Sequence, residues 1–359
     1  MVNITIWAGG YDVFIAAYIF NTATSSLTLA NTFPSGASCS WITGHPTNSS
    51  ILYATNELEP TGALQSFDIL PNNVLSPAVD TITSSGADPA FAAAVNGGRE
   101  IAIMNYSSGN GRIIPTTTSP EKFDNNAPVI TFPVPPGGVS HPHMAVQFGK
   151  EIFVPDLGAD MIWRLSPSGK AGVYSITGQI PQPTGSGPRH MRISNDRLYT
   201  LHELSSTLTV QTIPSYPNGT SHIISTASII PPNPPSSAEW AAGEILIPAA
   251  SQSFPKQYIY VSNRNTGVQT PTGDSIAIFE NVGQGTAREH LKLVTQVFTG
   301  LDQIRGMEFS RDGRYLVAAG KAGDAGVVVY ERVDGGRNLK ELARNKDIPT
   351  RTSFVWGEA

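Results

Sequence analysis

Short apolar runs separated by polar turns recur along the whole chain. A run of about six residues, rich in Val, Ile, Tyr and Phe, is followed by a polar turn, a second run, another turn and a third. β-branched and aromatic residues favour strands, and the apolar spacing of an amphipathic helix is almost absent. The pattern therefore predicts an all-β protein built from short antiparallel strands.

The runs repeat as larger units with a spacing of roughly 50 residues. Six units lie inside the chain, at residues 38–67, 88–113, 141–165, 187–210, 242–279 and 303–330. With about four strands in each unit, this spacing is typical of β-propeller blades. Strand-like segments are left over at both ends of the chain, at 4–7, 13–18 and 352–356.

We expect these terminal strands to combine into a seventh blade, because joining both ends closes the ring and removes free sheet edges. The sequence thus predicts a single seven-bladed β-propeller domain over residues 1–359, its last blade closed by strands from both termini. A pair of β-sandwiches and a six-bladed ring are the alternatives. Two stretches interrupt the repeat. We expect 214–237, rich in Pro, Ser and Asn, to be an extended surface connection, and 265–274 to be a loop that overhangs the site as a lid.

Composition narrows the class of protein. The 359 residues carry a formal net charge of −5, and 34 glycines and 28 prolines supply many turns. Without a basic stripe we expect no nucleic-acid partner, and no apolar run is long enough to span a bilayer, so no membrane partner is expected either. The start of the chain contains Asp12 but no Lys or Arg up to residue 20 and does not resemble a signal peptide. Cys39 is the only cysteine, which favours a cytoplasmic location.

Residues suited to chemistry occur where the apolar runs begin or end. His143 and Arg189 stand at the starts of first strands, and Asp156, Glu203 and Arg264 stand at the ends of second strands. In an antiparallel hairpin these two positions lie at the same end, so all five belong on one rim around the propeller axis. The same reasoning adds further rim residues from the other blades: Glu57, Asn105, Arg305 and Lys321.

The rim residues suggest a pocket for an anionic small molecule. Guanidinium groups of Arg189 and Arg264 suit a carboxylate or a developing oxyanion, since they bind planar oxygens bidentately. His143 and Glu203 suit proton transfer. We expect these four to be catalytic, with no metal and no cofactor. A further set of residues is expected to contact the substrate: Arg305, Glu57, Asn105, Asn263 and His141.

Neighbouring polar residues have structural explanations. Asp156 and Asp160 flank a good turn and suit hydrogen bonds within a blade. His190 and His202 alternate with Arg189 and Glu203 along their strands, so we expect both to point to the opposite face in structural roles. For His141, structural and functional roles are equally open.

At these residues the chain resembles the seven-bladed lactonase family, which groups propeller-type 6-phosphogluconolactonase with fungal carboxy-cis,cis-muconate cyclase. The ordered motifs that carry the resemblance are T-N-E at 55–57, P-H at 142–143, V-P-D-L-G-A-D at 154–160, G-P-R-H at 187–190, Y-V-S-N-R at 260–264, D-S-I-A-I-F at 274–279 and S-R-D-G-R-Y-L at 310–316. The closing strands, the Pro-rich connection and the substrate-facing loops match poorly.

The resemblance implies a metal-independent active site on one face of the propeller. For the muconate cyclase it implies a histidine, two arginines and a glutamate, which fall on His143, Arg189, Arg264 and Glu203 when matched motif by motif. These are the four residues that the rim argument selects. The resemblance leaves the substrate open.

The leading hypothesis is an enzyme that acts on a small-molecule lactone or carboxylate. It either hydrolyses a lactone or forms one by adding a carboxylate across a double bond. A second reading is a calcium-dependent lactonase with oxygen ligands from Glu57, Asn105, Asn263 and Glu203, although nearby arginines would repel the ion. A third is a non-catalytic propeller that binds a protein on its face.

Overall fold

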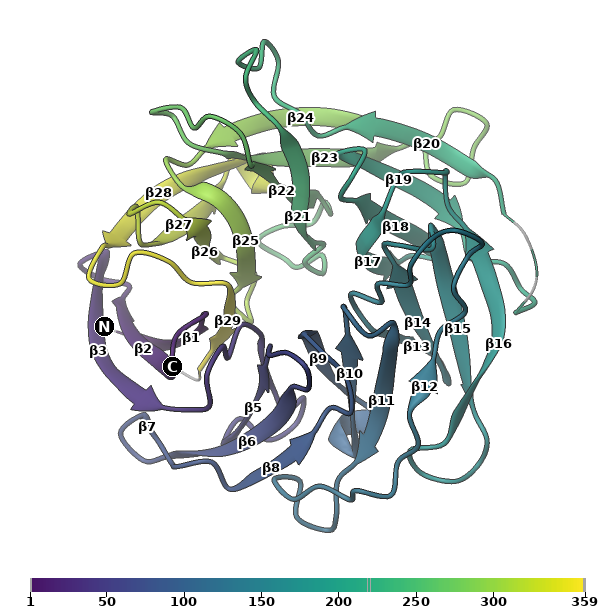
Figure 1. Ribbon diagram of the computed structural model, residues 1–359. Helices are drawn as coiled ribbons and strands as arrows, with labels where there is room; N and C mark the ends of the chain where they lie inside the picture. Colours follow the sequence, from purple (N-terminus) through teal and green to yellow (C-terminus); the bar gives the residue numbers. More distant parts are fainter. Residues whose placement is uncertain (1, 218, 220, 358–359) are drawn as a thin grey trace.

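A computed structural model describes residues 2–217, 219 and 221–357. In this part of the chain 29 strands form seven sheets arranged as a ring around a central axis (Figure 1). Six sheets have four strands, and the sheet that contains β4 has five. Two short 3-10 helices, η1 (Asn96–Gly98) and η2 (Asp334–Gly336), are the only helical elements of the described residues, and neither could span a membrane. The predicted seven-bladed β-propeller is therefore confirmed.

Within each blade the strands pair in antiparallel order from the axis outward. Blade one holds β4 (Ile42–Gly44), β5 (Ile51–Asn56), β6 (Ala63–Leu70), β7 (Val74–Leu75) and β8 (Asp80–Thr83); blade two β9 (Pro89–Val95), β10 (Glu100–Asn105), β11 (Asn110–Pro115) and β12 (Ile130–Thr131); blade three β13 (Val146–Phe148), β14 (Glu151–Asp156), β15 (Met161–Pro167) and β16 (Tyr174–Pro181); blade four β17 (Pro188–Ser194), β18 (Arg197–His202), β19 (Thr207–Thr212) and β20 (Ile223–Ser228). Blade five holds β21 (Trp240–Leu246), β22 (Ile259–Asn265), β23 (Ser275–Val282) and β24 (His290–Phe298); blade six β25 (Asp302–Phe309), β26 (Tyr315–Ala322), β27 (Val327–Val333) and β28 (Asn338–Asn345); blade seven β29 (Ser353–Trp356), β1 (Asn3–Gly9), β2 (Phe14–Asn21) and β3 (Ser26–Pro34).

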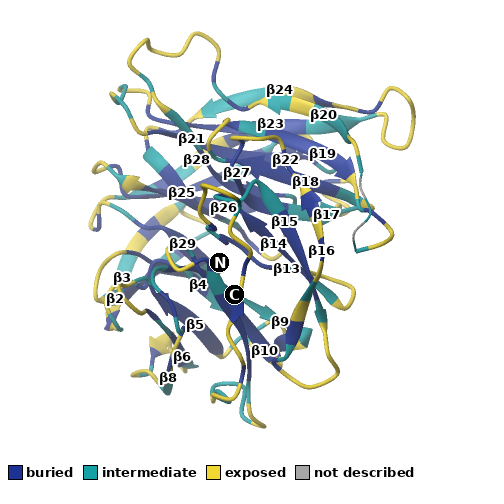
Figure 2. Cartoon of the chain, turned by 45° about the vertical axis from the view of Figure 1, so that its right-hand side comes forward, coloured by how far each residue is buried: buried dark blue, intermediate teal, exposed yellow. Residues whose placement is uncertain are grey.

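The second strands of the blades are buried on both faces. Every residue of β5, β10 and β22 is buried, whereas the outer strands β3 and β24 contain many exposed residues among buried and half-buried ones (Figure 2). This contrast arises because each blade packs between two others, which covers both faces of its inner strands. The continuous apolar runs seen in the sequence are these doubly covered strands.

Both termini build the closing blade. β29 pairs with β1 from Ile6 opposite Trp356 to Gly9 opposite Ser353, so the last strand of the chain becomes the innermost strand of a blade begun by its first residues. The N-terminal and C-terminal strands lie side by side in Figure 1. This confirms the predicted closure by strands from both termini.

Two local predictions were wrong. The stretch 214–237 is not only a connection, since it contains β20, the outermost strand of blade four, which pairs with β19. Its polar composition reflects the exposed outer edge of the ring. In blade three the first strand begins at Val146 rather than at 141–143, and the preceding segment is held only by an isolated bridge between Pro142 and Asp156.

Three consecutive innermost strands carry a β-bulge near the same end of the ring. The register shifts between Pro188 and His190 in β17, between Ala242 and Ile245 in β21, and between Ile304 and Gly306 in β25. A bulge leaves an extra residue out of the ladder and re-aims the side chains beside it. The bulges therefore break the alternation of side chains where blades four, five and six meet the axis.

Glycines allow these bulged strands to come close to their neighbours. A Cβ at Gly243 would lie 2.3 Å from the carbonyl oxygen of Ile304, and a Cβ at Gly306 would lie 2.4 Å from that of Thr352. Only glycine fits such close backbone approaches. The inner wall of the ring is thus packed tightly behind the charged residues described next.

Candidate active site

Two arginines from different blades converge on one carboxylate. Nε of Arg189, on β17, lies 2.7 Å from an oxygen of Glu203, and Nη2 of Arg264, on β22, lies 2.8 Å from the same oxygen. Glu203 follows directly after β18 and retains 20% of its side-chain exposure, while both arginine side chains are buried. Arg189, Glu203 and Arg264 form what we call the arginine–glutamate cluster.

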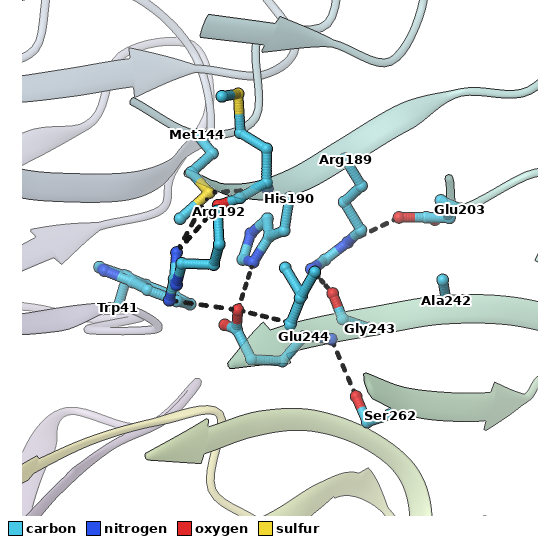
Figure 3. A network of polar contacts seen from close by, with 12 residues as sticks. Trp41, Met144, Arg189, His190, Arg192, Glu203, Ala242, Gly243, Glu244 and Ser262 are labelled. Carbon is cyan, nitrogen blue, oxygen red and sulfur yellow. Dashed lines mark hydrogen bonds and ion pairs between the residues drawn. The ribbon is translucent and has the colours of Figure 1, made fainter. Parts of the chain in front are cut away.

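Backbone carbonyls of β21 hold both guanidinium groups in place. Nη1 of Arg189 donates a hydrogen bond to the carbonyl of Gly243, as Figure 3 shows, and Nε and Nη2 of Arg264 both donate to the carbonyl of Ala242, at 3.0 and 2.8 Å. The bulge in β21 lies at these two carbonyls. The two cations are therefore positioned by rigid backbone rather than by Glu203 alone, which leaves the carboxylate position available to a competing anion.

A second ion pair lies on the other side of the axis. Nη2 of Arg305, on β25, is 3.0 Å from a Glu57 oxygen, and Nη1 donates to the carbonyl of Ser40. The Ser40 hydroxyl also donates to Glu57. Tyr11 donates to the other Glu57 oxygen at 3.2 Å, and the Arg305 guanidinium lies 5.2 Å from the centre of its ring. Both ion pairs thus place guanidinium groups near the same end of the axis.

Sequence reasoning missed Tyr11 and Ser40. Tyr11 lies in the turn between β1 and β2, and Ser40 lies in the connection that leads to β4. Neither stands in a motif. Only ring closure brings blade seven beside blades one and six, so no local signal in the sequence could have identified them.

His143 lies beside the cluster without a hydrogen-bond partner for its Nδ1. Its side chain is buried, and its ring meets the ring of Tyr106 edge-on at 5.6 Å. His141 stacks on the same tyrosine, with ring centres 4.2 Å apart, and its Nδ1 lies 2.8 Å from the Tyr106 carbonyl. Tyr106, a residue that sequence reasoning did not single out, therefore contacts both imidazoles.

Burial and the surrounding charges set the protonation states. Burial lowers the pKa of His143 well below its usual value, and Arg189 lowers it further, so the imidazole is neutral at pH 7. Burial acts to raise the pKa of Glu203, but Arg264 and Arg189 outweigh that effect and hold it below the ordinary value. Burial and the charge of Arg264 lower the pKa of Arg189 to about 10, which leaves it charged.

Positive charge exceeds negative charge at this end of the ring. The exposed Lys321, at the end of β26, has a lowered pKa because of desolvation and the charges of Arg264 and Arg305. Four cationic side chains thus face the carboxylates of Glu203 and Glu57 in the described residues. An anion is attracted to such a site.

Two of the predicted substrate-binding residues lie elsewhere. Asn105 and Asn263 are fully buried at the ends of β10 and β22. Nδ2 of Asn105 donates to the carbonyl of Ser84, and Nδ2 of Asn263 donates to that of Ile229. Both amides therefore tie a second strand to the connection that precedes its blade. Their neighbours, not these residues, face the site.

The carboxylates and histidines expected to be structural do bond within the fold. Asp156 accepts hydrogen bonds from the Ser140 hydroxyl, the backbone of His141 and the indole of Trp163. Asp160 accepts from the backbone of Gly185 and Gly187. His202 is buried, with Nε2 3.0 Å from the Thr209 hydroxyl.

The orientation predicted for His190 was wrong. Strict alternation with Arg189 would point it to the opposite face, but the bulge between Pro188 and His190 breaks that alternation. The ring of His190 instead lies near that of His143, with centres 5.1 Å apart, and Nδ1 is 2.9 Å from Glu244. His190 therefore lies in the interior next to His143 and bonds within the fold.

The donors proposed for calcium are engaged otherwise. Glu57 and Glu203 pair with arginines, and Asn105 and Asn263 bond inside their blades. Among the described residues no three His, Cys, Asp or Glu side chains gather as metal ligands would. The side chains at this site instead favour recognition of an anion.

Comparisons with known proteins agree with this architecture. Curated proteins of Staphylococcus aureus, described as uncharacterized, are 30% identical over 200 residues, which is 54% of this chain and 52% of theirs. The chain therefore spans about half the length of these relatives.

Solved structures with the same fold cover nearly the whole chain. A periplasmic gluconolactonase of Pseudomonas aeruginosa is 20% identical with a TM-score of 0.82, covering 99% of each chain. A protein described as a putative 6-phosphogluconolactonase of Bacteroides fragilis is 22% identical with a TM-score of 0.80, covering 99% of this chain and 98% of its own.

The family comparison also covers nearly the whole chain. Residues 5–356 match the family model described as "Lactonase, 7-bladed beta-propeller". Because this match includes every blade and both ion pairs, the chain belongs to the family of seven-bladed β-propeller lactonases.

Proposed function

We propose that this lactonase-family protein binds a lactone, or the carboxylate related to it, at the arginine–glutamate cluster. One observation carries the proposal: Arg189 and Arg264 direct two guanidinium groups at one oxygen of Glu203, within 2.7 and 2.8 Å. That arrangement suits a carboxylate or an oxyanion of a substrate equally well. The excess of cationic side chains around it supports a substrate with negative charge.

In the hydrolytic version, the arginines polarise the ring carbonyl. Water attacks the carbonyl carbon, and the oxyanion of the tetrahedral intermediate takes up the hydrogen bonds now made to Glu203. The ring C–O bond then breaks, and the leaving alkoxide receives a proton. The neutral His143 has one unprotonated ring nitrogen, which can accept the proton of water and return it to the alkoxide.

Glu203 could gain basicity when substrate binds. Burial raises its pKa, and the two arginines lower it. A substrate anion that draws Arg189 and Arg264 toward itself would weaken the second effect, so the pKa of Glu203 would rise toward the range useful for a general base. Substrate binding would thereby activate a group that is a weak base in the free protein.

The same groups also suit lactone formation. A substrate carboxylate held by Arg189 and Arg264 would add across an activated double bond, forming the ring C–O bond and a carbanion. His143 or Glu203 would take a proton from solvent and deliver it to that carbon. The resemblance to muconate cyclase supports this second candidate, because its four implied groups fall on residues that lie together here. A metal-dependent site is not favoured, since the four proposed oxygen donors already have protein partners.

The location of the protein in the cell remains a prediction. A single cysteine, which is buried, favours the cytoplasm. One structural relative is described as periplasmic.

Turnover of a panel of sugar lactones and muconolactone-type lactones, in the presence of EDTA, tests the proposal. We expect wild-type protein to act on one class of lactone and Arg189→Ala to lose at least ~100-fold in kcat/KM. Arg314→Ala is the matched control, because Arg314 forms an ion pair with Glu331 on the surface. Equal thermal melting of both variants would exclude unfolding as the cause.

Three results would contradict the proposal. Activity lost on adding EDTA would favour a metal-dependent lactonase. Full activity of Arg189→Ala would remove the cluster from the mechanism. Folded protein that turns over no lactone in either direction would favour a binding scaffold.

A further inference from the structure

A second imidazole lies behind His143. The ring of His190 is fully buried, with its centre 5.1 Å from that of His143 and the two planes inclined by 68°. Trp41 and Phe91 approach the same ring edge-on, at 5.5 and 5.7 Å between centres. His190 is therefore held by aromatic contacts on the side away from the arginine–glutamate cluster.

A buried carboxylate fixes this imidazole. Oε1 of Glu244 lies 2.9 Å from Nδ1 of His190, and the Glu244 side chain retains 1% of its exposure (Figure 3). The same oxygen accepts the backbone N–H of Ile245 at 2.8 Å, and the backbone N–H of Glu244 donates to the Ser262 hydroxyl. Glu244 sits within the bulge of β21, so its position depends on the same backbone that holds Arg189.

This geometry determines the tautomer of His190. Because Oε1 of Glu244 already acts as an acceptor toward Ile245, Nδ1 of His190 carries the proton and donates it to the same oxygen. Nε2 of His190 is then a bare acceptor. Nε2 of His190 is buried and has no hydrogen-bond partner in the described residues. Nδ1 of His143 is also buried and also lacks such a partner.

Two buried ring nitrogens in adjacent rings destabilise the fold when neither has a hydrogen-bond partner. A buried polar atom without a hydrogen bond destabilises the folded state. A small rotation of the His143 ring would let its Nδ1–H donate to Nε2 of His190. The remaining nitrogen of His143, Nε2, would then present a lone pair for proton transfer.

We propose that Glu244 and His190 are positioning residues that fix the tautomer and orientation of His143 for proton transfer in the reaction assigned above. The inference rests on the proposed function. Glu244 accepts a hydrogen bond from Nδ1 of His190, Nε2 of His190 accepts one from Nδ1 of His143, and His143 faces the substrate. When His143 takes up a proton, the Glu244 carboxylate stabilises the resulting charge through the intervening ring, as the third member of a catalytic triad does.

Charged groups from every neighbouring strand act on this pair. Cations outnumber anions: Arg189 and Arg192 on β17, Arg264 on β22 and Arg305 on β25 all lower the pKa of His190, after burial itself. Burial raises the pKa of Glu244, while Arg192, 3.6 Å away, lowers it. Glu308 on β25 is a second buried carboxylate near Glu244, and burial raises its pKa to about 7. Because the negative charge of Glu244 opposes the surrounding cations, loss of that charge should make protonation of His143 harder.

His190→Phe tests the positioning role. Phenylalanine keeps the aromatic contacts with Trp41 and Phe91 but cannot accept a hydrogen bond. We expect kcat for the lactone turned over by wild type to fall about 10- to 100-fold, with KM changed less than about threefold. Glu331→Gln is the matched control, because Glu331 is a surface carboxylate of β27 that forms an ion pair with Arg314.

Glu244→Gln tests the negative charge of Glu244 separately, because glutamine keeps an oxygen that can accept the hydrogen bond from Nδ1 of His190. We expect the acid limb of the kcat/KM profile to move to lower pH, since removal of the carboxylate charge lowers the pKa of His143. Glu331→Gln should leave that limb in place. Unchanged pH profiles in Glu244→Gln, or His190→Phe with the kcat of the control, would overturn the proposal.

Nitrogen-15 NMR of the histidine rings gives a readout that needs no substrate. In wild type we expect protonated Nδ1 and bare Nε2 in both His143 and His190, and a mixed tautomer of His143 in His190→Phe. A tautomer of His143 that does not respond to His190→Phe would overturn the inference even in active protein. Absence of lactone turnover with the expected tautomers would instead count against the proposed function alone.

Discussion

Two successive positions at the end of each second strand have opposite roles. The first is buried and bonds within the fold, as the residues at this position in blades one to five show: Asn56, Asn105, Asp156, His202 and Asn263. The second follows it and, in three of these blades, carries a side chain of the site: Glu57, Glu203 and Arg264. Because side chains of a strand alternate, one step along the chain changes a structural residue into a functional one.

The buried residue of each pair positions the site residue that follows it. Asn56, Asn105 and Asn263 each donate to a backbone carbonyl in the connection that precedes their blade. They hold the connection against the second strand, and the next residue is thereby directed at the axis. The positions of the site residues thus depend on buried hydrogen bonds made by neighbouring residues that do not themselves face the site.

The adjacent pair Asn263 and Arg264 allows the sharpest test of this division. Arg264→Ala removes a guanidinium group from the cluster. We expect kcat/KM to fall by ~10²- to 10³-fold, comparable to removal of one oxyanion donor, because a neutral side chain cannot hold the substrate anion. Steady-state kinetics with the lactone identified above measure the effect, and unfolding in urea checks that the variant is folded under the assay conditions. Activity within threefold of wild type would break the comparison.

Asn263→Ala should have the reverse profile. Its amide bonds to Ile229 and Ser275 in a fully buried position, so its loss leaves polar groups unpaired and should lower the free energy of unfolding by about 1–3 kcal/mol. The activity of the folded fraction should remain within about threefold. Urea denaturation followed by tryptophan fluorescence measures the stability. A stable but inactive Asn263→Ala variant would show instead that Asn263 belongs to the substrate site.

The pH dependence of stability should show how much the ion pairs of Glu203 contribute to the free energy of unfolding. The arginines hold the pKa of Glu203 below its unfolded value, so its contribution to stability is full above that unfolded value, near 4.3, and is lost as the pH falls through the folded pKa. We expect wild type to lose more free energy of unfolding than Glu203→Gln between pH 6 and pH 3.5. Equal losses in the two proteins would show that the ion pairs of the cluster do not contribute.

Some of the site could be predicted from the sequence because its residues stand at regular places in a repeat. Glu203 and Arg264 stand at the ends of recognisable second strands, and Arg189 stands at the start of a first strand, so antiparallel pairing alone brings them to one end. The direction of His190 could not be predicted in this way. A bulge adds one residue to the register, and its position depends on how closely β17 approaches its neighbours rather than on the local apolar pattern.

The sequence by itself determined the strands, their grouping into blades and the end of the ring at which charged residues gather. These features follow from contacts between residues near one another in the chain, which leave a periodic apolar pattern. Only the tertiary structure decided that Tyr11 and Ser40 join Glu57 and Arg305, and that Glu244 lies beneath His190. Those contacts form when seven blades close into a ring, and ring closure brings together residues whose separation along the chain carries no periodic signal.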